Sequence, residues 1–292
     1  MKHELRLPLT ATGRLDRAIA DALGVGRAPV KQAFHDGAVR LRGRRARASD
    51  PAAPGALVEI ELPETAGAPA PASELPLRVL VELPRCLVVD KPAGMATHPL
   101  LADEGGTLAN AVVARYPECA DASPDPREGG AVQRLDVETS GCVAFARDAD
   151  AWAALREQFA KRTVEKVYLA VVVGRMTVGG TCSLPLAQRG GRVLVVPDPE
   201  RAPRGAGRPR EALTHYEVVR TLPRHTVVEV RIVTGVMHQI RAHLAALGHP
   251  VVGDVLYGGD AAAVHGLLRH ALHAQRLSFD APDGERVTAE AP

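Results

Sequence analysis

The sequence predicts an α+β fold: a mixed, mainly antiparallel β-sheet domain with flanking helices, preceded by a small α/β domain. Its 292 residues suit about two domains of ordinary size. From Leu77 onward, short β-rich runs dominate and helical patterns are few, which is typical of α+β folds. A Pro- and Ala-rich stretch precedes this region. We therefore expect a small domain over 1–62, a linker over 63–76 and a large domain over 77–292.

The small domain is expected to run helix, helix, then small sheet. Apolar residues repeat every four positions within residues 13–25, which predicts the first helix. A second helix is expected from Pro29 to Gly37, because proline suits a first helical turn and glycine a helix end. The remaining expectations are strands over residues 38–41 and 58–62, with a turn at Arg42-Gly43.

The linker and the large domain follow from composition and from the run lengths of apolar residues. Four prolines interleaved with alanines predict a stiff, extended linker. Segment 189–210 carries six arginines among glycines and prolines, which indicates an exposed basic loop or hairpin arm. Strands are expected over 86–89, 142–146, 167–173, 213–220, 226–233 and 274–279, and helices near 150–161 and 238–247.

Composition excludes several classes of protein. Hydrophobic residues make up 46% and charged residues 24%, as in soluble globular chains. The four cysteines are widely spaced, so they suggest neither a disulfide framework nor a zinc knuckle. The sequence shows no secretion signal and no apolar run of membrane-spanning length, and we expect a cytoplasmic protein. The net charge is +2, but residues 1–62 alone carry 11 basic and 7 acidic side chains.

The densest polar motif lies in residues 132–141. Asp136 is followed by Thr139-Ser140-Gly141, residue types that turn the backbone. A carboxylate presented in this way by a rigid sheet is a candidate catalytic group. The alternative is that Asp136 only caps the turn with its carboxylate.

A second motif lies in residues 234–244 and continues to Gly253-Asp254. On a helix, His238 and Arg241 share one face, as do Gln239 and His243. The two histidines are five positions apart and point about 140° away from each other at ~100° per residue, which does not suit a shared metal. Arg241 as an ordinary surface cation is the alternative to a functional role.

These motifs together resemble those of the RluA-type RNA pseudouridine synthases. The resemblance covers residues 77–292. Residues 13–62 separately resemble an RNA-binding domain like that of the fourth small-subunit ribosomal protein, through Arg14-Leu15-Asp16, Lys31 and Gly37-Ala38-Val39. The blocks that carry the main resemblance are residues 87–99 (LVVDKPAGMATHP), Arg134-Leu135-Asp136 with Thr139-Ser140-Gly141, residues 166–170 (KVYLA), His238-Gln239-Ile240-Arg241 up to Gly253-Asp254, and Leu272-His273-Ala274.

The resemblance implies an isomerase with a central cleft that converts uridines in structured RNA to pseudouridine. Asp136 would be the initiating carboxylate and Arg241 its salt-bridge partner, while the ring of Tyr168 would pack on the target base. Arg134 would hold the gap left when the uridine leaves the stack, a step that costs a few kcal/mol. No metal, redox group or small-molecule cofactor is implied.

The resemblance also implies how the RNA is bound. The partner would be ribosomal or transfer RNA, recognised largely by its shape, and we expect no membrane partner and a monomeric chain. Basic side chains that follow the second helix would neutralise phosphates and make binding salt-dependent. The residues assigned to substrate binding are Arg134, Thr139, His238, Gln239, Lys91, Arg40, Arg42, Arg44 and Arg45, with Arg47 beside the last four.

Two departures from the family pattern keep other functions open. Gln133 stands where a histidine is usual, and Val236-Met237 stand where a basic residue and a hydroxyl residue often precede the second motif. One alternative is therefore an RNA-binding or ribosome-assembly factor with a decayed isomerase site. Another is a hydrolase of small glycosides, which would need a second carboxylate at a defined distance, with Glu138 as the near candidate.

Overall fold

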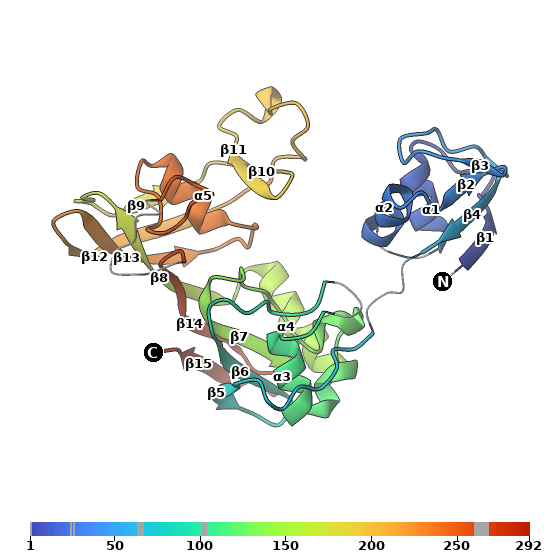
Figure 1. Ribbon diagram of the computed structural model, residues 1–292. Helices are drawn as coiled ribbons and strands as arrows, with labels where there is room; N and C mark the ends of the chain where they lie inside the picture. The colour runs from blue at the N-terminus through green and yellow to red at the C-terminus, as the bar shows by residue number, and fades with distance from the viewer. Residues whose placement is uncertain (1, 24, 26, 63–66, 101–103, 260–268) are drawn as a thin grey trace. The chain divides into compact units, whose positions relative to one another are not determined.

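The chain folds into two compact units, Met1–Gly67 and Ala68–Pro292, in the computed structural model (Figure 1). The structure describes residues 2–23, 25, 27–62, 67–100, 104–259 and 269–292. The boundary falls inside the predicted linker, of which residues 63–66 lie outside the described part. Residues 70 and 72 hydrogen-bond to Asn110, so the end of the predicted linker belongs to the second unit.

The first unit is a four-stranded antiparallel sheet with two helices, in the strand order β1-β4-β2-β3. The two predicted helices and both predicted strands are present. The expected order was wrong in one respect, because a strand precedes the helices. That strand pairs with β4 at the far end of the unit, a contact that local sequence does not reveal. The elements are β1 (Lys2–Arg6), α1 (Leu15–Leu23), α2 (Arg27–His35), β2 (Val39–Leu41), β3 (Arg44–Arg45) and β4 (Leu57–Glu61).

The second unit is built on one nine-stranded sheet, which confirms the α+β fold with a mixed, mainly antiparallel sheet. Its order is β5-β6-β7-β14-β8-β13-β12-β9, with β15 paired to β14, and only the β7–β14 pair is parallel. The strands are β5 (Arg78–Glu82), β6 (Cys86–Lys91), β7 (Ser140–Ala146), β8 (Glu165–Val173), β9 (Gly180–Cys182), β12 (Thr214–Thr221), β13 (His225–Ile232), β14 (Leu272–Asp280) and β15 (Arg286–Glu290).

Among the described residues, three α-helices and a hairpin complete the second unit. The helices are α3 (Leu108–Arg115), α4 (Ala149–Lys161) and α5 (Gln239–Ala246). A separate two-stranded hairpin, β10 (Leu186–Arg189) with β11 (Arg192–Val195), forms part of the predicted basic arm. No helix in the described ranges is long and apolar enough to cross a bilayer.

Strands β6 and β7 are buried on both faces, which explains their continuous apolar sequences. Alternate residues of β6 point to opposite sides: Cys86 and Val88 pack in the core beneath α4, and Leu87 and Val89 pack in the core beneath α3. A strand covered on both faces needs no polar alternation. Its rigidity makes the start of β7 a firm base for the polar loop that precedes it.

Candidate active site

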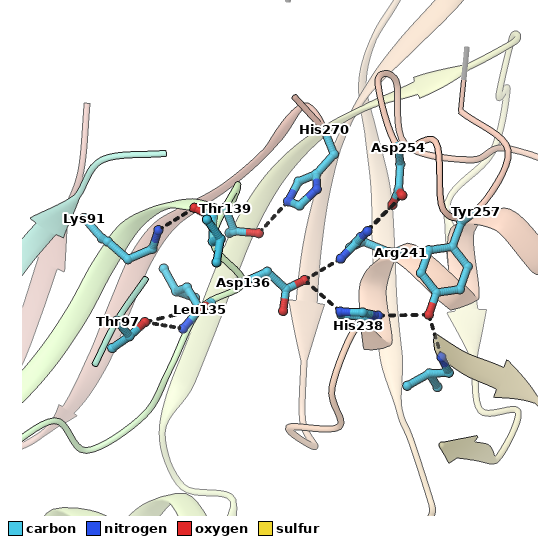
Figure 2. Close-up of polar contacts among 12 residues, drawn as sticks. Lys91, Thr97, Leu135, Asp136, Thr139, His238, Arg241, Asp254, Tyr257 and His270 are labelled. Atoms are coloured by element: carbon cyan, nitrogen blue, oxygen red, sulfur yellow. Dashed lines mark hydrogen bonds and ion pairs between the residues drawn. The ribbon is translucent and has the colours of Figure 1, made fainter. Parts of the chain in front are cut away.

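The loop 133–139 carries Asp136, and we call it the catalytic loop after the prediction for that residue. A cleft of about 910 Å³ opens where this loop, β8 and α5 meet. One wall is the loop 133–139, which leads into β7, and another is the segment 232–241, which leads from β13 into α5. Tyr168 of β8 and Leu272 of β14 also line it. The two sequence motifs, separated by about a hundred residues, therefore face one space, as Figure 2 shows.

Asp136 and Arg241 form a direct ion pair in this cleft. Arg241 donates from Nη1 to Asp136 Oδ2 over 2.8 Å, although the residues are 105 positions apart. The Asp136 side chain is 26% exposed and the Arg241 side chain 9%. Among the described residues, every hydrogen bond to this carboxylate is made at Oδ2. Oδ1 is thus left for a molecule in the cleft, and Asp136 does not use its carboxylate to cap the turn.

A second carboxylate, that of Asp254, also holds Arg241 in place. Asp254 accepts from Arg241 Nε over 2.6 Å and from Nη2 over 2.9 Å, a bidentate pair. Burial alone lowers the pKa of Arg241, but the hydrogen bonds and charges of the two aspartates outweigh it and raise the pKa above its ordinary value. Arg241 therefore stays charged and holds Asp136 Oδ2 in one place.

The backbone of the catalytic loop is anchored from both sides. Thr97 Oγ1 lies 3.2 Å from both the N–H and the carbonyl of Leu135. Lys91 Nζ donates to the carbonyl of Val137 over 2.9 Å, directly after Asp136. These bonds fix the residues on each side of Asp136, so other parts of the protein hold the loop in place.

The loop is also tied to β14 and the residues before it. Thr139 Oγ1 lies 2.7 Å from His270 Nε2. Burial, with a smaller contribution from the charge of nearby Arg241, lowers the pKa of His270 to about 4, so this histidine is neutral near pH 7. Gly141 has φ +114°, and a Cβ there would lie 2.2 Å from the carbonyl oxygen of Ala274. Only glycine lets β7 approach β14 this closely.

His238 approaches the same carboxylate from the start of α5. It lies just before the helix in a left-handed conformation with φ 54°, and its Nε2 is 3.8 Å from Asp136 Oδ2. The expectation that His238 lies on the helix was therefore wrong. Burial lowers its pKa, although the charge of Asp136 opposes the shift. A neutral His238 lies beside Asp136 without neutralising its charge.

Tyr257 is a residue of this site that the sequence analysis missed. Its hydroxyl accepts from the Val193 N–H over 2.8 Å and lies 3.1 Å from His238 Nδ1. Its ring lies 5.2 Å from the Arg241 guanidinium and 5.0 Å from that of Arg192. Tyr257 thus supports both residues that contact Asp136. In the sequence, only its position three residues after Asp254 indicated that Tyr257 could belong to the site.

Tyr168 lies on β8 at the floor of the cleft, in contact with two core clusters. Burial raises its pKa above the ordinary value, and the charge of Asp136 raises it further. The structure therefore brings together Asp136, Tyr168 and Arg241, the three residues predicted to be catalytic. The ring packs partly in the core and partly lines the cleft.

Three residues predicted to bind substrate make their polar contacts with other groups of the protein. Lys91 is fully buried, and besides Val137 it donates to the carbonyls of Pro92 and Met95, so its assignment was wrong. Burial lowers its pKa to about 8. Gln239 is 3% exposed and Thr139 is 2% exposed. The Gln239 amide group bonds to four protein groups and the Thr139 hydroxyl to His270, but both residues also line the cleft, so their assignment to substrate binding stays a prediction.

The predicted RNA-contacting arginines are exposed. Arg134 lines the cleft, and within the described ranges its side chain has no hydrogen bond or ion pair. In the first unit, β2 and β3 form a hairpin whose turn, Arg42-Gly43, has positive φ at both residues. This geometry matches a type I′ turn. The exposed arginines of the hairpin and its flank are Arg40, Arg42, Arg44, Arg45 and Arg47.

The arrangement fits one exposed carboxylate better than a pair of acids. Asp254 is the second acid near Asp136, but its side chain is 1% exposed and both oxygens bind Arg241. It is therefore not available as a second catalytic acid, and Glu138, the candidate named from the sequence, is not among the residues that line the cleft, which weakens the hydrolase alternative. In the described part of the chain, no group of three or more His, Cys, Asp or Glu side chains is placed to hold a metal.

Comparison with known proteins agrees with this geometry. The sequence pattern of the RNA pseudouridylate synthase family matches residues 85–246, which include both motifs. The ribosomal large subunit pseudouridine synthase D of Xanthomonas campestris is 38% identical over 98% of this chain and 87% of its own. The protein of the same name from Pseudomonas aeruginosa is 34% identical over 88% and 81%.

A solved structure shares the fold over about three quarters of this chain and is also similar in sequence. Human RNA pseudouridylate synthase domain containing 1 superposes with a TM-score of 0.59 and is 26% identical, over 76% of this chain and 85% of its own. The paired Asp136 and Arg241, the match over both motifs and the similarity along nearly the whole chain lead to one conclusion. This chain belongs to the RNA pseudouridylate synthase family and is an RNA pseudouridine synthase, an isomerase that acts on RNA.

Proposed function

We propose that this enzyme isomerises uridines of large-subunit ribosomal RNA, with Asp136 as the initiating carboxylate. The observation that carries the proposal is the Asp136–Arg241 ion pair at the floor of an open cleft. The substrate class is supported by relatives from Xanthomonas, Xylella and Pseudomonas that are named large-subunit pseudouridine synthases. We expect the enzyme to work in the cytoplasm, where it would meet that RNA.

The reaction needs a carboxylate that stays fixed while the base moves. The bond between C1′ of the ribose and N1 of uracil breaks, a bond between C1′ and C5 forms, and the proton on C5 is lost as N1 gains one. Arg241 holds Oδ2 of Asp136, and Oδ1 is the oxygen that faces the substrate. A preorganised charged group of this kind needs no rearrangement during the reaction.

The base must leave the RNA stack to reach Asp136. Extrusion costs a few kcal/mol, and a side chain that fills the gap offsets part of that cost. Arg134 precedes Asp136 by two residues and has a free guanidinium among the described residues. We assign it to this role and Tyr168 to packing against the extruded uracil.

The first unit is proposed to bind RNA outside the cleft. Its β2–β3 hairpin and flank expose five arginines within eight residues, and residues 1–62 carry more basic than acidic side chains. Few aromatic residues are available for stacking, at 3% of the chain. Binding through phosphates would therefore dominate and would fall steeply with salt.

Tritium release from RNA made with 5-tritiated uridine tests the proposal. The unmodified chain should release tritium from a large-subunit ribosomal RNA transcript, and Asp136→Asn should release none. A transfer RNA transcript serves as the second substrate. Release by Asp136→Asn at the normal rate would remove Asp136 from the mechanism. Preference for transfer RNA would refute the substrate class, and release from neither RNA would favour an RNA-binding factor.

A further inference from the structure

The cleft continues past the catalytic loop to a basic end that the isomerisation does not use. Its volume of about 910 Å³ is near the top of the range of ~300–1,000 Å³ that is usual for small-ligand pockets, so a neighbouring nucleotide has room to enter. We define the basic end by the charged side chains that line it there: Arg156, Arg162, Lys166, Arg208, Arg210 and one acid, Glu211.

These side chains come from two segments that face each other. Arg156 and Arg162 belong to α4 and its C-terminal cap, and Arg208 and Arg210 belong to the irregular segment before β12. Arg208 and Arg210 are exposed and, among the described residues, have no ion-pair partner. Two guanidinium groups are thus available on one wall of the cleft without breaking any contact of the protein.

Arg162 is held in an unusual backbone conformation. It caps α4 with φ 62° and ψ 30°, the left-handed region in which glycine is strongly favoured. From this position its Nη2 donates to Glu211 Oε2 over 2.7 Å, which links the two walls of the cleft. The side chains are 43% and 68% exposed. An ion pair this exposed adds little stability, so it exchanges readily for another anion.

We propose that the basic end binds the phosphodiester backbone of the RNA strand that enters the active site, with Glu211 as a competitor that a phosphate displaces from Arg162. The inference rests on the proposed function, because it requires RNA to occupy this cleft. A phosphate offers the planar guanidinium the same bidentate geometry as a carboxylate. It also meets Arg208 and Arg210, which Glu211 leaves unpaired.

The proposal predicts opposite effects from the two partners of one ion pair. Arg162→Gln removes a phosphate ligand and should weaken RNA binding about threefold to tenfold, as expected for one partly exposed charge-assisted contact. It should also reduce the slope of log K against log salt by about 0.7–0.9. Glu211→Gln removes the competitor and should strengthen binding. A purely structural ion pair would make the two variants behave alike.

The binding assay uses the full chain carrying Asp136→Asn, so that no turnover occurs, and a large-subunit ribosomal RNA fragment as the probe. Arg286 and Asp280 provide a matched exposed ion pair of 3.1 Å outside the cleft. Arg286→Gln and Asp280→Asn should leave the dissociation constant unchanged. Thermal unfolding of all four variants should match the parent, because each pair is exposed.

The outcomes separate this inference from the proposed function. Equal weakening by Arg162→Gln and Glu211→Gln, or no change in either, would overturn the phosphate site while leaving tritium release by the unmodified chain intact. Absence of tritium release by the unmodified chain would overturn the proposed function, whatever the two variants do. Weakening by the Arg286→Gln control equal to that by Arg162→Gln would show that only overall charge matters, and would also refute the site.

Discussion

Asp254→Asn tests whether a buried carboxylate positions the catalytic ion pair. Asp254 accepts two hydrogen bonds from Arg241, at 2.6 and 2.9 Å, while Arg241 reaches Asp136 with its remaining terminal nitrogen. Asparagine has nearly the same shape but keeps one acceptor and turns an NH₂ group toward the guanidinium. The substitution therefore changes the anchor of Arg241 and leaves Asp136 itself intact.

The expected cost follows from burial. A hydrogen bond to a charged group contributes about 1.5–3 kcal/mol, and breaking a buried ion pair costs about 3–5 kcal/mol. Asp136 still neutralises Arg241, and one acceptor remains, so we expect a loss of about 3 kcal/mol in the free energy of unfolding. A displacement of Arg241 by about 1 Å would lower the rate of isomerisation about 100-fold.

Denaturant unfolding and single-turnover tritium release measure the two effects separately. Asp148→Asn is the matched control, because Asp148 also forms a bidentate pair, with Arg85, but is 41% exposed and is not among the residues that line the cleft. Asparagine preserves its N-cap of α4. The control should lose less than about 1 kcal/mol and no activity. If Asp254→Asn matched this control in both assays, Asp254 would not be the anchor of Arg241.

Other substitutions test further parts of the site. Lys91→Met leaves three backbone carbonyls without their donor and should lower the free energy of unfolding by about 2–4 kcal/mol. The KM for RNA should not change. A raised KM with normal stability would show that Lys91 contacts the substrate after all. The pKa of His270 is about 4 in the folded chain and 6.5 in the unfolded chain, so the unfolded chain binds more protons and stability falls as the pH drops from 6.5 to 4. In denaturant unfolding measured across this pH range, His270→Gln should reduce that loss of stability. An unchanged pH dependence would show that His270 is not a buried neutral histidine. Tyr257→Phe keeps the ring but leaves the Val193 N–H without its acceptor. We therefore expect the free energy of unfolding to fall by about 1–3 kcal/mol and turnover to slow. A variant equal to the parent in both measurements would show that the hydroxyl is dispensable. Val236→Arg places a cation at the cleft and should change RNA affinity more than turnover in filter-binding and rate assays, whereas equal changes would refute this.

The fold was predictable where one element carries its own signal. Strand β6 reads as a continuous apolar run because both of its faces are covered, and α4 has its apolar residues on one face. Helix α3 was missed because six consecutive residues from Leu108 are buried, so it has no polar face to give a period. Strand β1 was missed because its pairing partner lies more than fifty residues away.

The candidate site shows the same division. Asp136, Tyr168 and Arg241 were identified from motifs and resemblance, and the structure brings all three to one cleft. Lys91 was misassigned to substrate binding because its sequence position does not show its burial, which gives its three protons to backbone carbonyls. His270 was not recognised, because its role depends on a hydroxyl 131 positions away.

The sequence by itself determined which chemical groups are present and in what order, and hence the family and the kind of reaction. Tertiary structure alone decided that Asp136 and Arg241 meet at 2.8 Å, that Asp254 supports the pair, and that arginines of two separate segments face each other across the basic end. The physical reason is that side-chain contact depends on the non-local path of the chain. Here the close pairing of β7 with β14, and of β14 with β8, sets that path.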